Sequence, residues 1–305
     1  MKLKVLTGIM LTKSVAIEFL ENKWGMVNVE QQIQEDREKF LNKLIVTIHE
    51  RVPFQLLFIR NLALLPPEDR KLPNIEEVDR VCMSGEGGNC IFINLFTSRL
   101  LNALGYSAYV CRSVVTSNVF NGHLLVIVKD LTNQGDLHLV DCGLGLPSFR
   151  AISLNFNKES PVYKDSFLEY KFIKHEGKVI RMHGDGDLVA RNDPPIEGLD
   201  FILGKWRRFY EFPIETLECK RWEDLGPIFS LQYLSVVDPR AATFPGGRAV
   251  LLNGGNILSI EQDDKTLKTV KLQSTEIFPA FRKYFPNINE ELIQQAYSTW
   301  QKSKL

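Results

Sequence analysis

Apolar residues recur at helical spacing through the first part of the chain. The charged stretch QQIQEDREKF leads into LNKLIVTIHERV, and the pattern runs from residue 12 to about residue 62, where the prolines of LLPPEDRKLP interrupt it. A second apolar run, IFINLFTSRLLNALG, follows Cys90 and ends at Gly105, a residue type that suits the C-terminal cap of a helix. The pattern predicts a helical N-terminal region and a buried helix that begins at Cys90.

From Tyr106 onward the pattern changes to short strands separated by turn signals. The predicted strands and hairpins are YSAYVCRSVV, HLLVIVKD, LHLVD, EYKFIKHEGKVIRMH, KWRRFYEF and RAVLLNGGNILSIE. The turn at residues 253–256 favours the last of these hairpins. A helix-like run begins at Lys220, and NEELIQQAYSTWQK predicts a closing helix with Asn287 or Asn289 as its cap. Strands therefore follow the helix of Cys90.

Composition and charge narrow the function classes. The chain has 305 residues, with 44% hydrophobic and 24% charged residues, which is ordinary for a globular protein of two or three domains. Lys plus Arg and Asp plus Glu each total 37, so no overall charge favours nucleic acid or an anionic membrane as a partner. We expect no signal peptide, because charge resumes at Lys13, and no membrane span. Five cysteines without framework spacing favour a cytoplasmic location.

Three residues each lie in a sequence context that suits one role in activating a thiol nucleophile. Cys90 follows the pair Gly87-Gly88 and opens the predicted helix, His123 starts one strand, and Asp141 ends another. A free thiol is mostly protonated near neutral pH, so a nucleophilic cysteine needs a helix N-terminus or an imidazole to favour its thiolate. An aspartate on the far imidazole nitrogen fixes the tautomer. The pattern is a Cys-His-Asp triad in outline.

Simpler interpretations apply to most of these residue types. A cysteine in an apolar run is usually an inert core residue, and we interpret Cys82, Cys111, Cys142 and Cys219 in that way. A single His or Asp at a strand end is more often a satisfied polar residue or a turn former. The run HGDGDLVARND lacks the final glutamate of a calcium loop and is interpreted as a polar turn, so no metal site is expected. Only the combination distinguishes Cys90.

Four segments around these residues resemble the arylamine N-acetyltransferases. They are HERVPF, GGNCIFIN, NGHLLVIV and LVDCGLG. In that family a glycine pair, one variable residue and the nucleophilic cysteine are followed four residues later by Asn, which here is Asn94. The resemblance is firm from about residue 44 to about residue 145 and loose beyond.

Several positions depart from the family pattern. Glu86 stands where the family usually has an arginine, and Gln55 where it has an acidic residue. The two family residues form an ion pair, and a carboxylate facing an amide could keep a hydrogen bond there. Phe92 replaces a polar residue, and Leu144 replaces an aromatic one. None of these changes removes a member of the triad.

The resemblance implies an α+β fold of the papain-like cysteine-enzyme arrangement. We expect a helical N-terminal domain over residues 1–85, the nucleophile helix with a small β-barrel over residues 86–205, and a mixed α/β lid over residues 206–305. It also implies that Phe54, Gly122 and Leu144 line an acceptor pocket. The segment at 242–247, with Thr243 and Phe244, is implied to contact CoA.

The function that the resemblance implies is transfer of an acetyl group from acetyl-CoA to an arylamine or arylhydrazine. Cys90 would carry the acetyl group, and His123 would move protons in a ping-pong cycle. Two alternatives stay open. A cysteine hydrolase or transglutaminase-like enzyme could use the same triad, and a retained scaffold could serve only as a binding protein.

Overall fold

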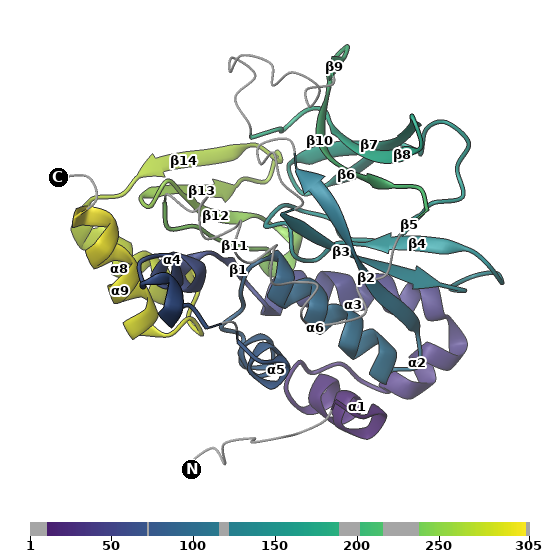
Figure 1. The fold of residues 1–305 in the computed structure, drawn as a ribbon, viewed down its shortest axis with the longest axis horizontal. Helices are drawn as coiled ribbons and strands as arrows, with labels where there is room; N and C mark the ends of the chain where they lie inside the picture. The colour runs from purple at the N-terminus through teal and green to yellow at the C-terminus, as the bar shows by residue number, and fades with distance from the viewer. Residues whose placement is uncertain (1–10, 72, 116–121, 189–201, 216–237, 303–305) are drawn as a thin grey trace.

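The fold was analysed in a computed structural model that describes residues 11–71, 73–115, 122–188, 202–215 and 238–302. Helices and strands are mixed, with a helical part, a curled antiparallel sheet and a smaller sheet that packs against helices (Figure 1). The predicted helix-like run at 220–237 lies outside the described residues. No helix within these ranges is long and apolar enough to cross a membrane.

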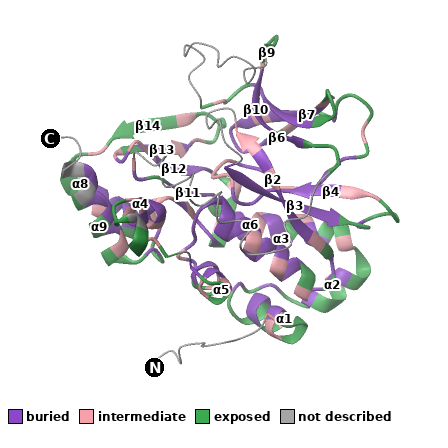
Figure 2. Cartoon of the chain, viewed as in Figure 1, coloured by how far each residue is buried: buried purple, intermediate pink, exposed green. Residues whose placement is uncertain are grey.

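The first helices build the layer that supports the candidate nucleophile. They are α1 (Lys13–Asn22), α2 (Val29–Glu35), α3 (Arg37–Arg51), α4 (Leu57–Ala63), α5 (Ile75–Ser84) and α6 (Cys90–Ala103). Asp36 caps α3 by accepting a hydrogen bond from the amide of Lys39 at 2.9 Å. Helix α6 is buried along most of its length and packs against α5 and the sheet (Figure 2). It begins at Cys90, as the sequence predicts, and Gly105 follows it with a φ of 88°.

One expected helical region is interrupted by a short strand. Residues 54 and 55 form β1 (Phe54–Gln55), which lies between α3 and α4. Phe54 and Gln55 pair antiparallel with Ala242 and Ala241, far along the chain. Helical spacing in the sequence carries no information about a partner at that distance, so this strand was not predicted.

The curled sheet has nine strands in the described part of the chain. They are β2 (Ser107–Val115), β3 (His123–Lys129), β4 (Leu137–Val140), β5 (Ile152–Ser153), β6 (Tyr163–Asp165), β7 (Leu168–His175), β8 (Lys178–His183), β9 (Ile202–Leu203) and β10 (Trp206–Pro213). Their order is β5-β4-β3-β2-β10-β8-β7-β6, with β9 on β10. The β7–β8 hairpin and the strand KWRRFYEF are confirmed. The expected boundary between residues 205 and 206 falls inside this sheet, because β10 pairs with β8 and β2.

The C-terminal part is a five-stranded sheet with two helices. Its elements are β11 (Ala241–Thr243), β12 (Val250–Asn253), β13 (Ile257–Glu261), β14 (Leu267–Lys271), α8 (Ser274–Tyr284) and α9 (Glu290–Lys302), with β1 as the fifth strand. The predicted β12–β13 hairpin is confirmed, and Gly254 and Gly255 turn with positive φ. Asn289 is the cap of α9, because its side chain accepts from the amide of Glu291 at 2.8 Å. Helix α9 packs on α4.

Candidate active site

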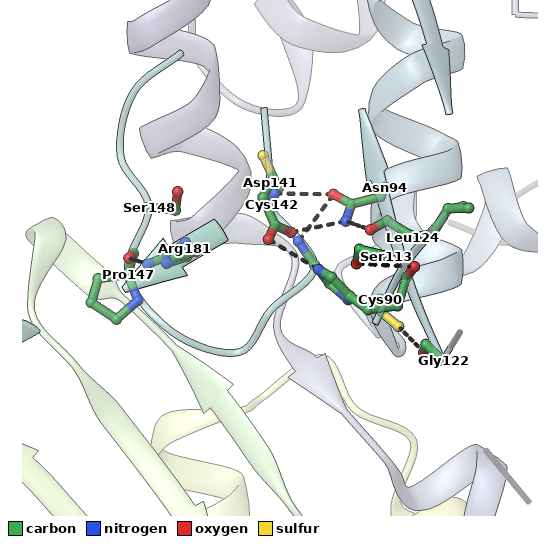
Figure 3. Close-up of polar contacts among 12 residues, drawn as sticks. Cys90, Asn94, Ser113, Gly122, Leu124, Asp141, Cys142, Pro147, Ser148 and Arg181 are labelled. Atoms are coloured by element: carbon green, nitrogen blue, oxygen red, sulfur yellow. Dashed lines mark hydrogen bonds and ion pairs between the residues drawn. The ribbon is translucent and has the colours of Figure 1, made fainter. Parts of the chain in front are cut away.

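Cys90 is the first residue of α6, and the helix is capped just before it. The Asn89 side chain accepts hydrogen bonds from the amides of Ile91 and Phe92 at 3.1 and 3.2 Å. The thiol therefore lies in the first turn, where the helix dipole favours negative charge. Its Sγ lies 3.7 Å from the carbonyl oxygen of Gly122, the residue before β3 (Figure 3).

The two glycines before Cys90 allow a close approach of backbone to backbone. Gly87 has a φ of 72°, and a Cβ there would lie 1.9 Å from the carbonyl oxygen of Pro53. A Cβ on Gly88 would lie 2.5 Å from the ring of Phe92. With both glycines in place, the amide of Gln55 donates to the Gly88 carbonyl at 2.8 Å. The segment that precedes α4 is thus fixed beside the nucleophile loop.

His123 and Asp141 face each other from neighbouring elements of the curled sheet. His123 begins β3, and Asp141 follows β4, which pairs with β3. His123 Nε2 lies 3.0 Å from Asp141 Oδ2, and both side chains are buried. This contact leaves Nδ1 of the ring for Cys90. The structure therefore brings together all three residues of the predicted triad.

The charges of this pair depend on each other. Burial alone would lower the pKa of His123, but the charge and hydrogen bond of Asp141, with a hydrogen bond to Cys90, raise it to about 10. Burial would likewise raise the pKa of Asp141, yet His123, Arg181 and Asn94 hold it below its usual range. An imidazolium next to a carboxylate is thus the favoured state near neutral pH. Such a cation stabilises a thiolate beside it.

Asn94 joins the helix of Cys90 to the loop of Asp141. Its Nδ2 donates to Asp141 Oδ1 at 3.0 Å and to the carbonyl oxygen of Leu124 at 2.6 Å (Figure 3). Its Oδ1 accepts from the amides of Cys142 and Gly143 at 3.0 and 3.1 Å. The sequence pattern contained Asn94 but gave it no role. Its spacing of four residues from Cys90, on the same helix face, was the available signal.

His49 of α3, in the segment HERVPF, contacts both the loop after Asp141 and the segment after β11. Its Nε2 donates to the carbonyl oxygen of Ser148 at 3.1 Å, and its ring packs edge-on against Phe149 and Phe244. Its own carbonyl oxygen accepts from the amide of Phe244 at 3.2 Å. Burial lowers the pKa of His49 to about 4, so the ring is neutral at physiological pH.

The predicted acceptor residues lie around the loop that follows Asp141. Gly122 contacts Cys90 through its carbonyl oxygen. Phe54 is half-buried, and its ring would lie 2.6 Å from a Cβ on Gly145. Leu144 is also half-buried and packs against the same apolar cluster as Phe54. The structure thus places Phe54 beside the turn that carries Leu144.

The predicted CoA residues are less accessible than the loop that follows them. Thr243 and Phe244 are buried, and the Phe244 ring packs against His49 and Phe149. The turn Pro245–Gly247 and Arg248 are largely exposed, and Arg248 lies 2.7 Å from Asp263. The surface that this segment presents is therefore its turn.

The suggested hydrogen bond between Gln55 and Glu86 is wrong. Gln55 Oε1 instead accepts from the amides of Leu57 and Phe58 at 2.8 and 3.2 Å. Those amides belong to the first turn of α4, which has no cap from the side chain of Leu56. The side chain of Gln55 therefore caps the next helix, and Glu86 is half-buried.

The run HGDGDLVARND is predicted to be a polar turn, and its last five residues, 189–193, lie outside the described part of the chain. Asp187, within it, lies 2.9 Å from Arg207 Nε, so its carboxylate belongs to an ion pair. Within the described ranges, no cluster of His, Cys, Asp or Glu side chains is arranged to hold a metal ion.

Solved structures of arylamine N-acetyltransferases share this fold. The enzyme from Mycobacterium abscessus superposes with a TM-score of 0.66 at 16% identity, covering 96% of this chain and 98% of that chain. The enzyme from Mycobacterium marinum, solved in complex with CoA, gives a TM-score of 0.63 at 17% identity, covering 85% and 92%. The enzyme from Salmonella typhimurium gives 0.61 at 14% identity, covering 84% and 89%.

The family assignment comes from a match over most of the sequence. A family model described as N-acetyltransferase matches residues 39–291. No curated relative matches the chain. The protein belongs to the arylamine N-acetyltransferase family and is an acyltransferase.

Proposed function

We propose that this enzyme moves an acetyl group from acetyl-CoA to an arylamine or arylhydrazine through a thioester on Cys90. The observation that carries the proposal is the position of His123, which hydrogen-bonds Asp141 through Nε2 at 3.0 Å and Cys90 through its other side. The CoA complex of the Mycobacterium marinum relative supports CoA as the carrier. Transfer occurs in two half-reactions that share one site.

In the first half-reaction the thiolate of Cys90 attacks the thioester carbonyl of acetyl-CoA. The carbon–sulfur bond to CoA breaks as the bond to Cys90 forms, and the His123 imidazolium gives its proton to the departing CoA sulfur. The products are acetylated Cys90, a neutral His123 and free CoA. Asp141 keeps the ring in the orientation and tautomer that this step needs.

In the second half-reaction the nitrogen of the acceptor attacks the acetyl carbonyl on Cys90. Neutral His123 accepts the proton that the nitrogen loses, and the carbon–sulfur bond to Cys90 breaks. The thiolate–imidazolium pair is restored, and the acetylated amine leaves. An aromatic amine suits this step because its low basicity leaves the nitrogen unprotonated near neutral pH.

We assign the acceptor to the surface around Phe54, Gly122 and Leu144, and the donor to the segment that contains Thr243 and Phe244. Because both of these last side chains are buried, the exposed turn at residues 245–247 is the part that contacts CoA. In this turn the amide of Gly246 is the candidate donor to a phosphate oxygen, because Pro245 has no N–H and the amide of Gly247 donates to the carbonyl oxygen of Phe244 at 3.0 Å.

The test is a single-turnover experiment followed by intact mass. Incubation with acetyl-CoA alone should add one acetyl group, and peptide mapping should place it on Cys90. Adding an arylamine should then remove the group and yield one equivalent of acetylated amine. Cys90→Ala should accept no acetyl group, whereas Cys82→Ala, at a buried cysteine in α5, should behave as the wild type. Acetylation of another cysteine, or release of acetate in place of acetylated amine, would contradict the proposal.

A further inference from the structure

Arg181 is a fully buried cation on a strand of the curled sheet. It lies on β8 with 0% of its surface exposed. No carboxylate within the residues that the structure describes lies at ion-pair distance from it. An arginine is almost never fully buried without such a partner, because a buried charge is costly.

The other buried arginines of the sheet are paired. Arg207 Nε lies 2.9 Å from Asp187, and Arg208 Nε lies 3.3 Å from Glu211. These two side chains follow the usual rule that a buried charge has a nearby opposite charge. Arg181 therefore has a reason for its burial other than a local ion pair.

The contacts of Arg181 are to a carbonyl, an imidazole and aromatic rings. Nη2 donates to the carbonyl oxygen of Pro147 at 3.0 Å (Figure 3), and Nε donates to His183 Nε2 at 3.0 Å. The guanidinium carbon lies 4.2 Å from the ring centre of Tyr170 and 5.8 Å from that of Tyr210. These contacts hold the guanidinium in place but leave its charge unneutralised.

Two of these contacts connect Arg181 to residues of the candidate active site. Pro147 belongs to the loop that leaves Asp141, so the hydrogen bond from Arg181 restrains that loop. The ring of Tyr210 lies 5.6 Å from the ring of His123 between centres. The charge of Arg181 also contributes to the low pKa of Asp141. The positive charge of Arg181 therefore acts on the carboxylate of Asp141, although the two side chains do not form a direct ion pair.

We propose that Arg181 is a positioning residue of the Cys90–His123 pair, which supplies a fixed positive charge near Asp141 and restrains the loop that follows it. This inference rests on the proposed role of Cys90 as the nucleophile. A nearby positive charge lowers the pKa of an ionisable group, because it stabilises the form that has lost a proton. Arg181 thus helps the pair to reach the thiolate–imidazolium state at a lower pH than it would otherwise.

The titratable groups around Arg181 determine the pH range in which the reactivity of Cys90 can be compared. They are His49 of α3, Asp141 after β4, Asp165 of β6, Tyr170 of β7, His183 of β8, Asp187 after β8 and Tyr210 of β10. The pKa values of His49 and His183 are lowered to about 4 and about 3, mainly by burial. Burial raises the pKa of Tyr170 and of Tyr210, whereas hydrogen bonds and nearby cations lower the pKa of Asp141 and of Asp165. The charges of these two histidines, two tyrosines, Asp141 and Asp165 are therefore expected to stay constant between about pH 5 and pH 9.

The experiment measures the rate of Cys90 alkylation by iodoacetamide against pH, with the modified peptide identified by mass. Arg181→Met and Arg181→Gln remove the charge, and Arg181→Lys keeps it. The neutral variants should shift the midpoint of the profile to higher pH by about half a unit or more, which is about a threefold lower rate on the rising limb. Arg181→Lys should stay close to the wild type. Two neutral variants are used so that at least one folded protein carries the comparison.

A matched control separates the local effect of Arg181 from general destabilisation. Arg207→Met removes another buried cation from the same sheet, but one that is paired with Asp187. It should lower the melting temperature and leave the alkylation profile unchanged. A neutral Arg181 variant that folds and gives the wild-type profile would overturn the proposal, as would an equal shift in Arg207→Met.

The alkylation profile also distinguishes a failure of the proposed function from a failure of the proposed role of Arg181. If Cys90 in the wild type reacts no faster than an unactivated thiol, the proposed nucleophile is wrong and the proposed function fails with it. If Cys90 is reactive in the wild type and equally reactive in Arg181→Met at every pH, only the role of Arg181 is wrong.

Discussion

The side chain of Asn94 donates a hydrogen bond from Nδ2 to Asp141 Oδ1 at 3.0 Å, one helical turn beyond Cys90. The same helix that carries the thiol therefore also orients the carboxylate. The loop after Asp141 lies close against this helix, since a Cβ on Gly143 would be 2.8 Å from Cys90 Cα. Only glycine permits that approach, and Asn94 Oδ1 accepts from the Gly143 amide there.

Asn94→Ala should reduce both stability and transfer activity. Four hydrogen bonds of the buried amide are lost, and their donors and acceptors stay buried, so we expect a loss of about 2 to 4 kcal/mol in the free energy of unfolding. We also expect a decrease of about tenfold or more in kcat/KM, because Asp141 loses one of the groups that orient it. Urea unfolding and steady-state kinetics measure the two effects.

Asn102→Ala is the matched control for this change. Asn102 lies on the same helix, and its side chain bonds the backbone of Ala108 at 2.7 and 2.9 Å, away from Asp141. It should lose stability while keeping its alkylation profile at Cys90. Equal losses of activity in the two variants would mean that Asn94 only stabilises the fold.

Asp141→Asn should fold but lose most of its activity. Without the carboxylate, the burial that lowers the pKa of His123 is opposed only by Cys90, so this pKa falls from about 10 and the imidazolium is less favoured at neutral pH. We expect kcat to fall by about a thousandfold or more. The thiolate should also form at higher pH, which iodoacetamide alkylation of Cys90 measures. Superimposable alkylation profiles would assign Asp141 a structural role only.

Local signals made the centre of this site predictable. A cap residue, an apolar run and Gly105 define α6, and strand ends carry His123 and Asp141. Each of these signals depends on neighbours within a few residues. The closing helix was predicted for the same reason with Asn287 or Asn289 as its cap, and the structure shows that Asn289 is the cap.

Contacts between distant parts of the chain could not be predicted in the same way. The pairing of Gln55 with Ala241 involves a strand of two residues, too short to give a periodic pattern. The pairing of β10 with β2 joins segments almost a hundred residues apart. Arg181 shows the limit for single residues, because a charged residue in a strand is usually assigned to the exposed face, whereas Arg181 is fully buried.

Acid should destabilise the protein through its buried histidines. The pKa of His49 is about 4 in the folded state, below its ordinary value of 6.5. Its contribution to stability is therefore complete above about pH 6.5 and declines as the pH falls toward 4, by up to about 3 kcal/mol. His183, with a pKa of about 3, acts in the same direction. His49→Gln should remove about half of this pH dependence between pH 7 and pH 4, measured by urea unfolding. His175→Gln, at an exposed position, should keep the wild-type slope.

Leu144→Phe should change which amine the enzyme prefers. Leu144 is half-buried next to the turn that touches Phe54, and a ring at this position can stack on an aromatic acceptor. Stacking is worth about 0.5 to 1.5 kcal/mol beyond area burial, which corresponds to a shift of roughly 2- to 12-fold in preference. We expect a higher kcat/KM for a compact arylamine relative to a bulky one.

Leu146→Phe is the control that separates selectivity from packing. Leu146 is also half-buried and packs against the same apolar cluster, two residues further along the loop. A ring that merely overpacks this cluster lowers stability by about 1 to 3 kcal/mol and leaves the ratio between two amines unchanged. We expect that result for Leu146→Phe and the altered ratio for Leu144→Phe. Melting temperatures and the two-substrate ratio measured on both variants decide the matter, because a destabilised Leu144→Phe with an unaltered ratio would place Leu144 in the core and outside the acceptor pocket.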